Sequence, residues 1–126
     1  MTTPAAGRTV AIVGASNDRR KFGNRAVRAY LRQGYDVRPV HPTLAEVEGL
    51  RVYPTLDAIA DRVHIVSFYV PPAIGIDLLD AVAAKAPNEF WINPGAGSPP
   101  LLARAAALGL KPIQACSIIA IGEVPV

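Results

Sequence analysis

The sequence predicts a single α/β domain built on a doubly wound parallel sheet. Strand-like apolar segments alternate with helical patterns five times along its 126 residues, as is typical of parallel sheets covered by helices on both faces. The length suits one domain, and a hydrophobic fraction of 51% is enough to fill its core. Ligands of such sheets bind beyond the carboxyl ends of the strands, so the loops that follow the strands form the candidate site.

The N-terminal half contains the clearest periodicities. Residues 9–13 are almost all apolar, whereas Val27, Tyr30 and Leu31 recur at helical spacing. Gly34 suits the left-handed position that ends a helix. The predicted elements are, in order, a loose arm over 1–8, a strand over 9–13, a helix over 23–33, a strand over 35–40, a polar connection over 44–51 and a minimal strand at 52–53.

The C-terminal half continues the alternation. Residues 63–70 are rich in β-branched and aromatic side chains and predict a central buried strand. Thr55 and Ser98 are each placed to cap a following helix. The predicted elements are a short helix over about 56–61, a strand over 63–70, a helix over 73–85, a strand over 89–92, a helix over 99–108, a last strand over 111–114 and a tail over 115–126.

Composition and charge exclude several classes of protein. The only cysteine, Cys116, cannot form an internal disulfide, and the N-terminus lacks a signal-peptide pattern, so a cytoplasmic location is expected. No apolar run is long enough to span a bilayer. Residues 1–40 carry eight Arg and Lys against two Asp, whereas residues 41–126 carry five against eight acids. This local positive field suits a small polyanion, and the lack of an aromatic-rich basic stripe argues against a nucleic-acid partner.

The segment Thr9–Gly23, TVAIVGASNDRRKFG, predicts an anion site. A buried strand, a tight loop over residues 14–16 and a helix start follow one another. The start of a helix has unpaired N–H groups and a partial positive charge, and both favour a bound phosphate. Arg19, Arg20 and Lys21 add three cations to the same loop.

A nicotinamide adenine dinucleotide site is not expected. Such a site would show G-x-G-x-x-G after the first strand, but Ile12 stands in place of the first glycine, and the loop from Gly14 to Gly23 is too long. An acid that would bind a ribose hydroxyl is also missing from residues 40–42. The missing acid is compatible with a phosphate on the ribose, which leaves NADP or coenzyme A.

The ordered motifs resemble the CoA-binding domain family. They are Gly14-Ala15-Ser16 with the basic loop and Gly23, Gly34-Tyr35, Val40-His41-Pro42, Val70-Pro71, Trp91 with Gly95-Ala96, and Cys116-Ser117-Ile118. The resemblance extends over about residues 8–119 and is greatest to short, stand-alone bacterial members. It implies a Rossmann-like fold related to the CoA-binding part of succinyl-CoA synthetase and of ADP-forming acyl-CoA ligases.

The resemblance also implies contacts to coenzyme A or an acyl-CoA. The backbone N–H groups of residues 14–16 would approach the pyrophosphate, and Lys21 with a neighbouring arginine would neutralise phosphate charge. Residues 40–42 would border the adenosine, and residues 70–72 would form the opposite wall. The candidate cofactor-binding residues are Gly14, Ala15, Ser16, Asn17, Arg19, Arg20, Lys21, Gly23, Val40, His41, Pro42, Val70, Pro71 and Pro72.

Two positions depart from the family pattern. The family often has Asn before the proline that follows the second strand and Lys after it, where this sequence has His41 and Thr43. Without that lysine, the contact to the 3′-phosphate of coenzyme A would fall to Arg38 or Arg20.

No catalytic constellation is expected. Metal-ligand spacing is absent, and neither His41 nor His64 has an acid partner by spacing. The chain ends with the predicted domain, whereas dehydrogenases and acyl-CoA ligases use a second domain for catalysis. We therefore expect a non-catalytic CoA-binding module. The alternatives are an NADP-binding subunit of a reductase and a nucleic-acid-associated protein, and a homodimer or a partner protein stays open.

Other chemically noticeable side chains have simpler explanations. His41 either stacks on a ligand or forms hydrogen bonds within its loop, and both roles stay open. His64 and Trp91 are expected to be structural, and Cys116 is expected to be a small, inert thiol. Four aspartates at solvent-facing helical positions are assigned no chemistry, namely Asp57, Asp61, Asp77 and Asp80.

Overall fold

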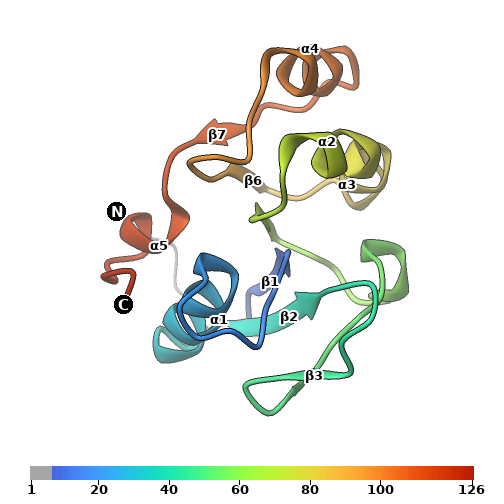
Figure 1. Ribbon diagram of the computed structural model, residues 1–126. Helices are drawn as coiled ribbons and strands as arrows, with labels where there is room; N and C mark the ends of the chain where they lie inside the picture. Colours follow the sequence, from blue (N-terminus) through green and yellow to red (C-terminus); the bar gives the residue numbers. More distant parts are fainter. Residues whose placement is uncertain (1–6) are drawn as a thin grey trace.

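The computed structural model describes residues 7–126, which form a five-stranded parallel sheet with helices on both faces (Figure 1). The strand order is β2-β1-β5-β6-β7, so the chain runs outward from β1 in both directions. The doubly wound parallel sheet predicted from the sequence is confirmed. The strands are β1 (Thr9–Val13), β2 (Asp36–Val40), β5 (Ile65–Phe68), β6 (Glu89–Ile92) and β7 (Ile113–Gln114).

The two faces of the sheet have separate hydrophobic cores. In β1, Val10 and Ile12 pack with Tyr30 on one face, whereas Ala11 and Val13 pack with Leu79 and other residues on the opposite face. One face carries α1 (Phe22–Arg32) and α5 (Ser117–Ala120). The other carries α2 (Pro72–Gly75), α3 (Leu79–Lys85), α4 (Pro99–Ala107) and the 3₁₀ helices η1 (Leu56–Ala58) and η2 (Ile76–Leu78) (Figure 1).

Several predicted boundaries are confirmed. The strands predicted over 9–13 and 89–92 have those bounds. Both predicted helix caps form, because the hydroxyl of Thr55 accepts from the Ala58 N–H and that of Ser98 from the Leu101 N–H, each at 3.3 Å. The predicted helix over 73–85 is helical but includes the tighter turn η2.

The connection between β2 and η1 was predicted wrongly. The supposed polar connection over 44–51 contains an antiparallel hairpin, β3 (Glu46–Val47) and β4 (Leu50–Arg51). The supposed strand at 52–53 is only an isolated bridge between Tyr53 and Val40. The hairpin turns at Glu48 and Gly49, both with positive φ, which is the geometry of a type I′ turn. Asn-Gly is the usual sequence signal for that turn. Because Glu48 stands in place of Asn, the turn could not be predicted from the sequence.

Both ends of the domain also differ from expectation. The predicted tail over 115–126 contains α5, whose Ser117 and Ile118 are buried. Arg8, assigned to a loose arm, joins the fold, because its carbonyl accepts from the Asp36 N–H at 3.0 Å and its guanidinium lies 3.6 Å from Glu89. The rest of the predicted arm, residues 1–6, lies outside the described residues.

Candidate functional site

The cleft of the molecule lies where the strand order reverses. The chain leaves β1 toward β2 on one side and returns to β5 on the other, so the loops after β1 and β5 diverge. Ligands of doubly wound sheets bind at this point. A cavity of about 540 Å³ opens there, lined by Gly14, Arg20, Lys21, Phe22, Gly23, Tyr69, Val70, Pro71, Pro72, Pro94, Gly95 and Ala96.

Two glycines allow the loop after β1 to fold tightly. We call residues 14–23 the anion loop. A side-chain carbon added at Gly23 would lie 2.0 Å from the carbonyl oxygen of Gly14, so the start of α1 rests directly on the end of β1. Gly14 has a φ of +95°, and a carbon added there would lie 2.7 Å from the carbonyl oxygen of Tyr69. Glycine at both positions therefore lets the anion loop pack directly against the backbone of its neighbours.

The start of α1 presents free donors and positive charge. Within residues 7–126, the N–H groups of Phe22 and Gly23 have no hydrogen-bond acceptor. The helix has no side-chain cap and no acid in its first turn. In the same part of the chain, no carboxylate lies within 4.0 Å of the Lys21 ammonium. These are the properties of an anion site at a helix N-terminus.

The structure corrects the expected role of the first two loop residues. The N–H groups of Gly14 and Ala15 both donate to the carbonyl of Val40, at 3.1 and 3.3 Å. They are therefore occupied and cannot donate to a pyrophosphate as the resemblance implied. Val40 itself is buried at the end of β2, where its carbonyl ties that strand to the anion loop.

Side chains inside the anion loop fix its shape. The Ser16 hydroxyl accepts from the Asp18 N–H at 3.0 Å. The Asp18 carboxylate accepts from the Arg20 N–H and from its guanidinium, at 3.0 to 3.1 Å. These hydrogen bonds from Arg20 lower the pKa of Asp18 from 3.8 to about 2.

Asn17 and Arg19 face the hairpin rather than the cleft. The Asn17 amide donates to the carbonyl of Glu46 at 3.0 Å, and the Arg19 guanidinium lies 3.3 Å from the Glu48 carboxylate. Neither residue lines the cavity. Of the three predicted cations, therefore, only Arg20 and Lys21 lie on the cleft.

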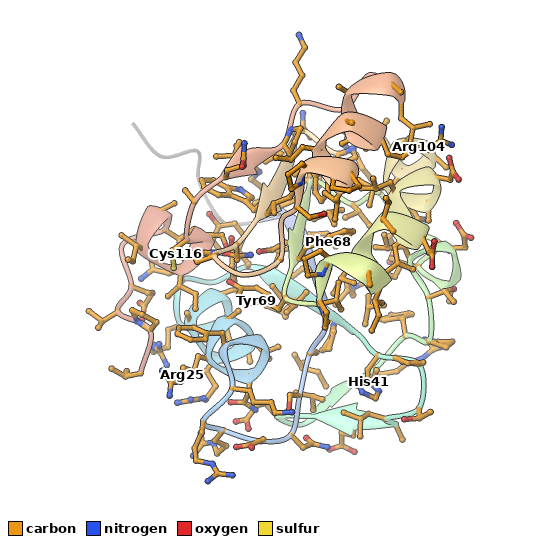
Figure 2. All side chains as sticks on the ribbon, turned by 45° about the horizontal axis from the view of Figure 1, so that its top comes forward. Arg25, His41, Phe68, Tyr69, Arg104 and Cys116 are labelled. Carbon is orange, nitrogen blue, oxygen red and sulfur yellow. The ribbon has the colours of Figure 1, made fainter. Side chains whose placement is uncertain are left out.

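His41 has a role within its own loop. Its Nδ1 accepts from the N–H groups of Thr43 and Leu44, both at 3.1 Å. Neither His41 nor Pro42 lines the cavity, and Figure 2 places His41 on the opposite side of Tyr69 from Cys116. The structure thus supplies the loop hydrogen bonds that the sequence left open for His41, whereas Val70, Pro71 and Pro72 do line the cavity.

The two candidates for a 3′-phosphate contact differ in availability. The guanidinium of Arg38 binds Asp36 at 2.9 Å, Asp61 at 2.7 Å and the Tyr53 hydroxyl at 3.0 Å. The hydrogen bond from Arg38 lowers the pKa of Asp36. Arg38 is therefore held by two acids and a hydroxyl, whereas Arg20 is paired, among residues 7–126, with Asp18 alone and its side chain is 89% exposed at the edge of the cleft.

A buried polar cluster beside the cleft was not foreseen. The Asn93 amide donates to the Ser67 hydroxyl at 2.8 Å and to the Phe68 carbonyl at 2.9 Å, and its oxygen accepts from the Ser117 N–H at 2.9 Å. The Ser117 hydroxyl lies 2.8 Å from that of Ser67 and 3.0 Å from that of Tyr69. The cluster ties α5 to the ends of β5 and β6, below the cleft wall formed by residues 94–96.

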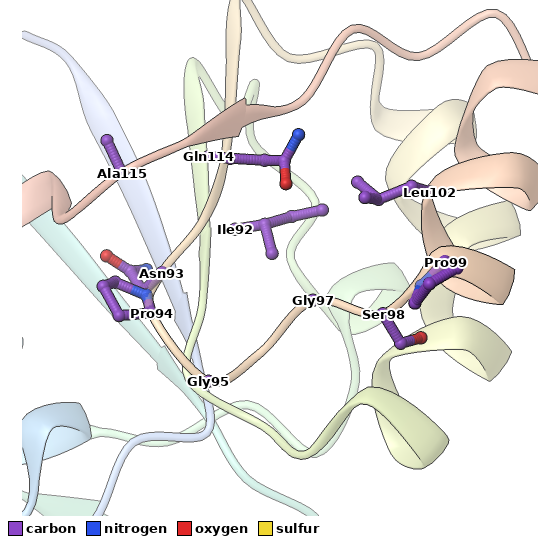
Figure 3. A pocket seen from close by; sticks show the side chains of 10 residues that line it. All are labelled: Ile92, Asn93, Pro94, Gly95, Gly97, Ser98, Pro99, Leu102, Gln114 and Ala115. Carbon is purple, nitrogen blue, oxygen red and sulfur yellow. The ribbon is translucent and has the colours of Figure 1, made fainter.

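A second cavity adjoins the first. It has a volume of about 350 Å³ between the end of β6, the start of α4 and β7 (Figure 3). Pro94 and Gly95 line both cavities. The remaining lining includes Ile92 and Leu102 as well as the polar side chains of Ser98 and Gln114. The second cavity therefore offers a recess of mixed apolar and polar character on the other side of Pro94 and Gly95 from the main cleft.

The other noticeable side chains mostly follow expectation. His64 is structural, because its Nδ1 accepts from the Thr9 N–H at 3.0 Å, and Trp91 packs against the core. Cys116 borders a small cavity of about 70 Å³ with Phe22 and Tyr69, and its reactivity stays untested. In the described part of the chain, no group of three potential metal ligands occurs, and no helix is long and apolar enough to cross a membrane.

Comparisons with known proteins place this fold and cleft. The chain matches the family described as "CoA binding domain" over residues 8–122. No curated protein is significantly similar in sequence. Among solved structures, a conserved hypothetical protein from Pyrococcus furiosus is 28% identical, with a TM-score of 0.81, coverage of 90% of this chain and 98% of that chain. A protein from Thermus thermophilus is 27% identical, with a TM-score of 0.80 and coverage of 89% and 86%.

A larger enzyme contains a similar domain. An acetyl-coenzyme A synthetase of Ca. Korarchaeum cryptofilum, described as dinucleotide forming and in complex with phosphate and ADP, is 26% identical with a TM-score of 0.74. The match covers 88% of this chain but only 26% of the synthetase. The fold and the cleft at the switch point thus define a Rossmann-like α/β domain. The chain belongs to the CoA binding domain family.

Membership of this family bears on the two predicted cofactors, coenzyme A and NADP. It supports coenzyme A as the kind of ligand and gives no support to NADP.

Proposed function

We propose that this chain binds coenzyme A or an acyl-CoA without transforming it, with the pyrophosphate at the uncapped start of α1. The observation that carries the proposal is that free N–H donors, Arg20 and Lys21 meet on one cavity at the switch point. Charge-assisted hydrogen bonds to phosphate are about twice as strong as neutral ones. Arg20 is the proposed contact to the 3′-phosphate, because Arg38 is held by Asp36 and Asp61.

The chemistry of the cleft favours binding over catalysis. Among residues 7–126, those that line the main cavity include no His, Cys, Asp or Glu, so this wall offers no general base of the usual kind. Tyr69 is the one titratable neutral side chain there, and burial raises the pKa of its hydroxyl. A cleft with cations and backbone donors but no base suits a carrier, sensor or regulatory module.

Thermal unfolding with a panel of ligands tests the proposal. Coenzyme A at 100 times its Kd should stabilise the protein by about 2.7 kcal/mol, because a ligand that binds only the folded state shifts the folding equilibrium. Dephospho-CoA should stabilise it less, since it lacks the group proposed to contact Arg20. NADP and short duplex DNA should leave the unfolding temperature unchanged at moderate salt.

Two results would contradict this assignment. Stabilisation by NADP without stabilisation by coenzyme A would show that the cleft binds a nicotinamide cofactor instead. A shift with DNA that persists at moderate salt would indicate a nucleic-acid partner, because weak contacts to phosphates alone lose affinity steeply as salt rises.

Lys21 gives a residue-level test. Lys21→Ala should weaken coenzyme A binding by about 1–3 kcal/mol, because it removes one charge-assisted contact to phosphate. Unfolding should be unaffected, since Lys21 is exposed and has no ion-pair partner in the described chain. Calorimetric titration with coenzyme A measures the change. Lys111→Ala is the matched control, because it removes the same charge just before β7, at the end of the sheet away from the cleft. Equal affinities of the two variants would show that Lys21 does not contact the ligand.

A further inference from the structure

The hairpin of β3 and β4 lies against the anion loop, and one residue makes the connection. We infer that Glu48 is a positioning residue that holds the anion loop in the shape required to bind phosphate. This inference rests on the proposed function of the loop and adds a residue that lies outside the cleft. Glu48 sits at the tip of the hairpin and does not line the cavity.

The Glu48 carboxylate contacts the middle of the anion loop and the first turn of α1 that follows it. One oxygen accepts from the Asn24 side-chain amide at 3.1 Å, and the other lies 3.3 Å from the Arg19 guanidinium. Asn24 is fully buried, and the same amide donates to the carbonyl of Ser16 at 2.9 Å. Glu48 is therefore linked through one buried side chain to the backbone that turns out of β1. The hydrogen bond from Asn24 is also the main cause of the lowered pKa of Glu48.

The network continues into α1. The side-chain oxygen of Asn24 accepts from the Arg28 Nε at 2.8 Å, and the Arg28 guanidinium donates to the carbonyl of Arg19 at 2.9 Å. Asn24 thus uses both halves of its amide. Because a buried amide that loses an acceptor is costly, removal of the Glu48 carboxylate should loosen Asn24 and the Ser16 carbonyl together.

The backbone conformation at residue 48 disfavours glutamate, so the hairpin turn itself does not explain this residue. Its φ is +48°, and Gly49 follows with a φ of +79°. Asn is much better suited than Glu to the first position of a type I′ turn. The hairpin alone would therefore be more stable with Asn at this position. The contacts of the Glu48 side chain with the anion loop give a reason for a residue that the turn disfavours.

Electrostatics alone predicts the opposite effect on binding. Glu48 is a negative charge beside a site proposed for a polyanion, so its removal should strengthen binding through simple Coulomb interaction. A positioning role predicts weaker coenzyme A binding when the side chain at residue 48 is too short to accept the hydrogen bond from Asn24. The two explanations can be separated with variants that change charge equally but differ in reach.

The test compares Glu48→Gln with Glu48→Asn. Both replace the carboxylate with a neutral amide, but only Gln has the length to accept from Asn24. The comparison does not depend on the ion pair with Arg19, because both variants lose it. Glu48→Gln should bind coenzyme A at least as tightly as the unchanged protein, and Glu48→Asn should bind roughly tenfold more weakly than Glu48→Gln. Equal affinities of the two variants would overturn the inference.

Hydrogen exchange in the ligand-free protein keeps the inference independent of the proposed function. The amides of Asp18, Arg20 and Lys21 are hydrogen bonded within the anion loop and report its order. They should exchange faster in Glu48→Asn than in Glu48→Gln, while amides of β5 exchange equally. If the unchanged protein failed to bind coenzyme A, the proposed function would fall, and exchange alone would decide the role of Glu48. Equal exchange of the loop amides in both variants would show that Glu48 does not position the loop.

Discussion

Replacing Gly23 with alanine should lower the free energy of unfolding by about 3 kcal/mol and reduce coenzyme A binding beyond detection. The added carbon would lie 2.0 Å from the carbonyl oxygen of Gly14 and 3.4 Å from the Cα of Ala15. These are backbone atoms, so no side-chain rotation can relieve the overlap. The start of α1 must move away from the end of β1, and its free N–H groups then leave the cleft. Chemical denaturation and calorimetric titration measure the two effects.

Gly75 provides the matched control for this prediction. It also lies in a helical segment, but the nearest atoms to an added carbon belong to the side chains of Leu101 and Phe68, at 3.2 Å. Side chains can shift by a few tenths of an ångström, and alanine is a better helix former than glycine. Gly75→Ala should therefore stay within about 1 kcal/mol of the unchanged protein and bind coenzyme A normally. A Gly23→Ala protein as stable as Gly75→Ala would contradict the close contact between α1 and β1.

The strand, loop and helix start of the anion loop could be predicted from the sequence because their signals are local. An apolar strand, a glycine and a run of cations lie within fifteen residues, from Thr9 to Gly23. The direction of the N–H groups of Gly14 and Ala15 is not local. It depends on the carbonyl of Val40, which another strand brings to the end of β1. The sequence therefore predicts the position of the site but not which of its backbone donors are free.

The availability of Arg38 shows the same limit. Asp36, the acid nearest to Arg38 in the sequence, is two residues away and can be seen there. Asp61 and Tyr53 contact Arg38 only because the fold brings them together. The cleft wall at residues 94–96 could be predicted in part, because these residues follow the strand predicted over 89–92 and ligands bind at that end of a parallel sheet. Nothing in the sequence indicated that Asn93, directly after that strand, would be buried.

Replacing Asn93 with alanine should lower the free energy of unfolding by about 3 kcal/mol, because one side chain satisfies three buried groups. Its amide donates to the Ser67 hydroxyl and the Phe68 carbonyl, and its oxygen accepts from the Ser117 N–H. The residue is 3% exposed, so water has little access to replace these bonds. Asn88→Ala is the control. The Asn88 side chain is exposed and accepts only from Arg62, so its loss should cost at most about 0.5 kcal/mol.

A double-mutant cycle of Asn93→Ala with Ser67→Ala separates the cluster from simple loss of packing. Ser67 is fully buried and shares hydrogen bonds with both Asn93 and Ser117. Residues in one buried network are coupled by about 0.5–3 kcal/mol, whereas independent sites add. We expect the double variant to be less destabilised than the sum of the single variants, because the second substitution removes a hydroxyl that has already lost its donor. Strict additivity in denaturant unfolding would mean that Asn93 acts alone. Coupling would instead show that Asn93, which follows β6, and Ser67 of β5 act as one hydrogen-bonded unit.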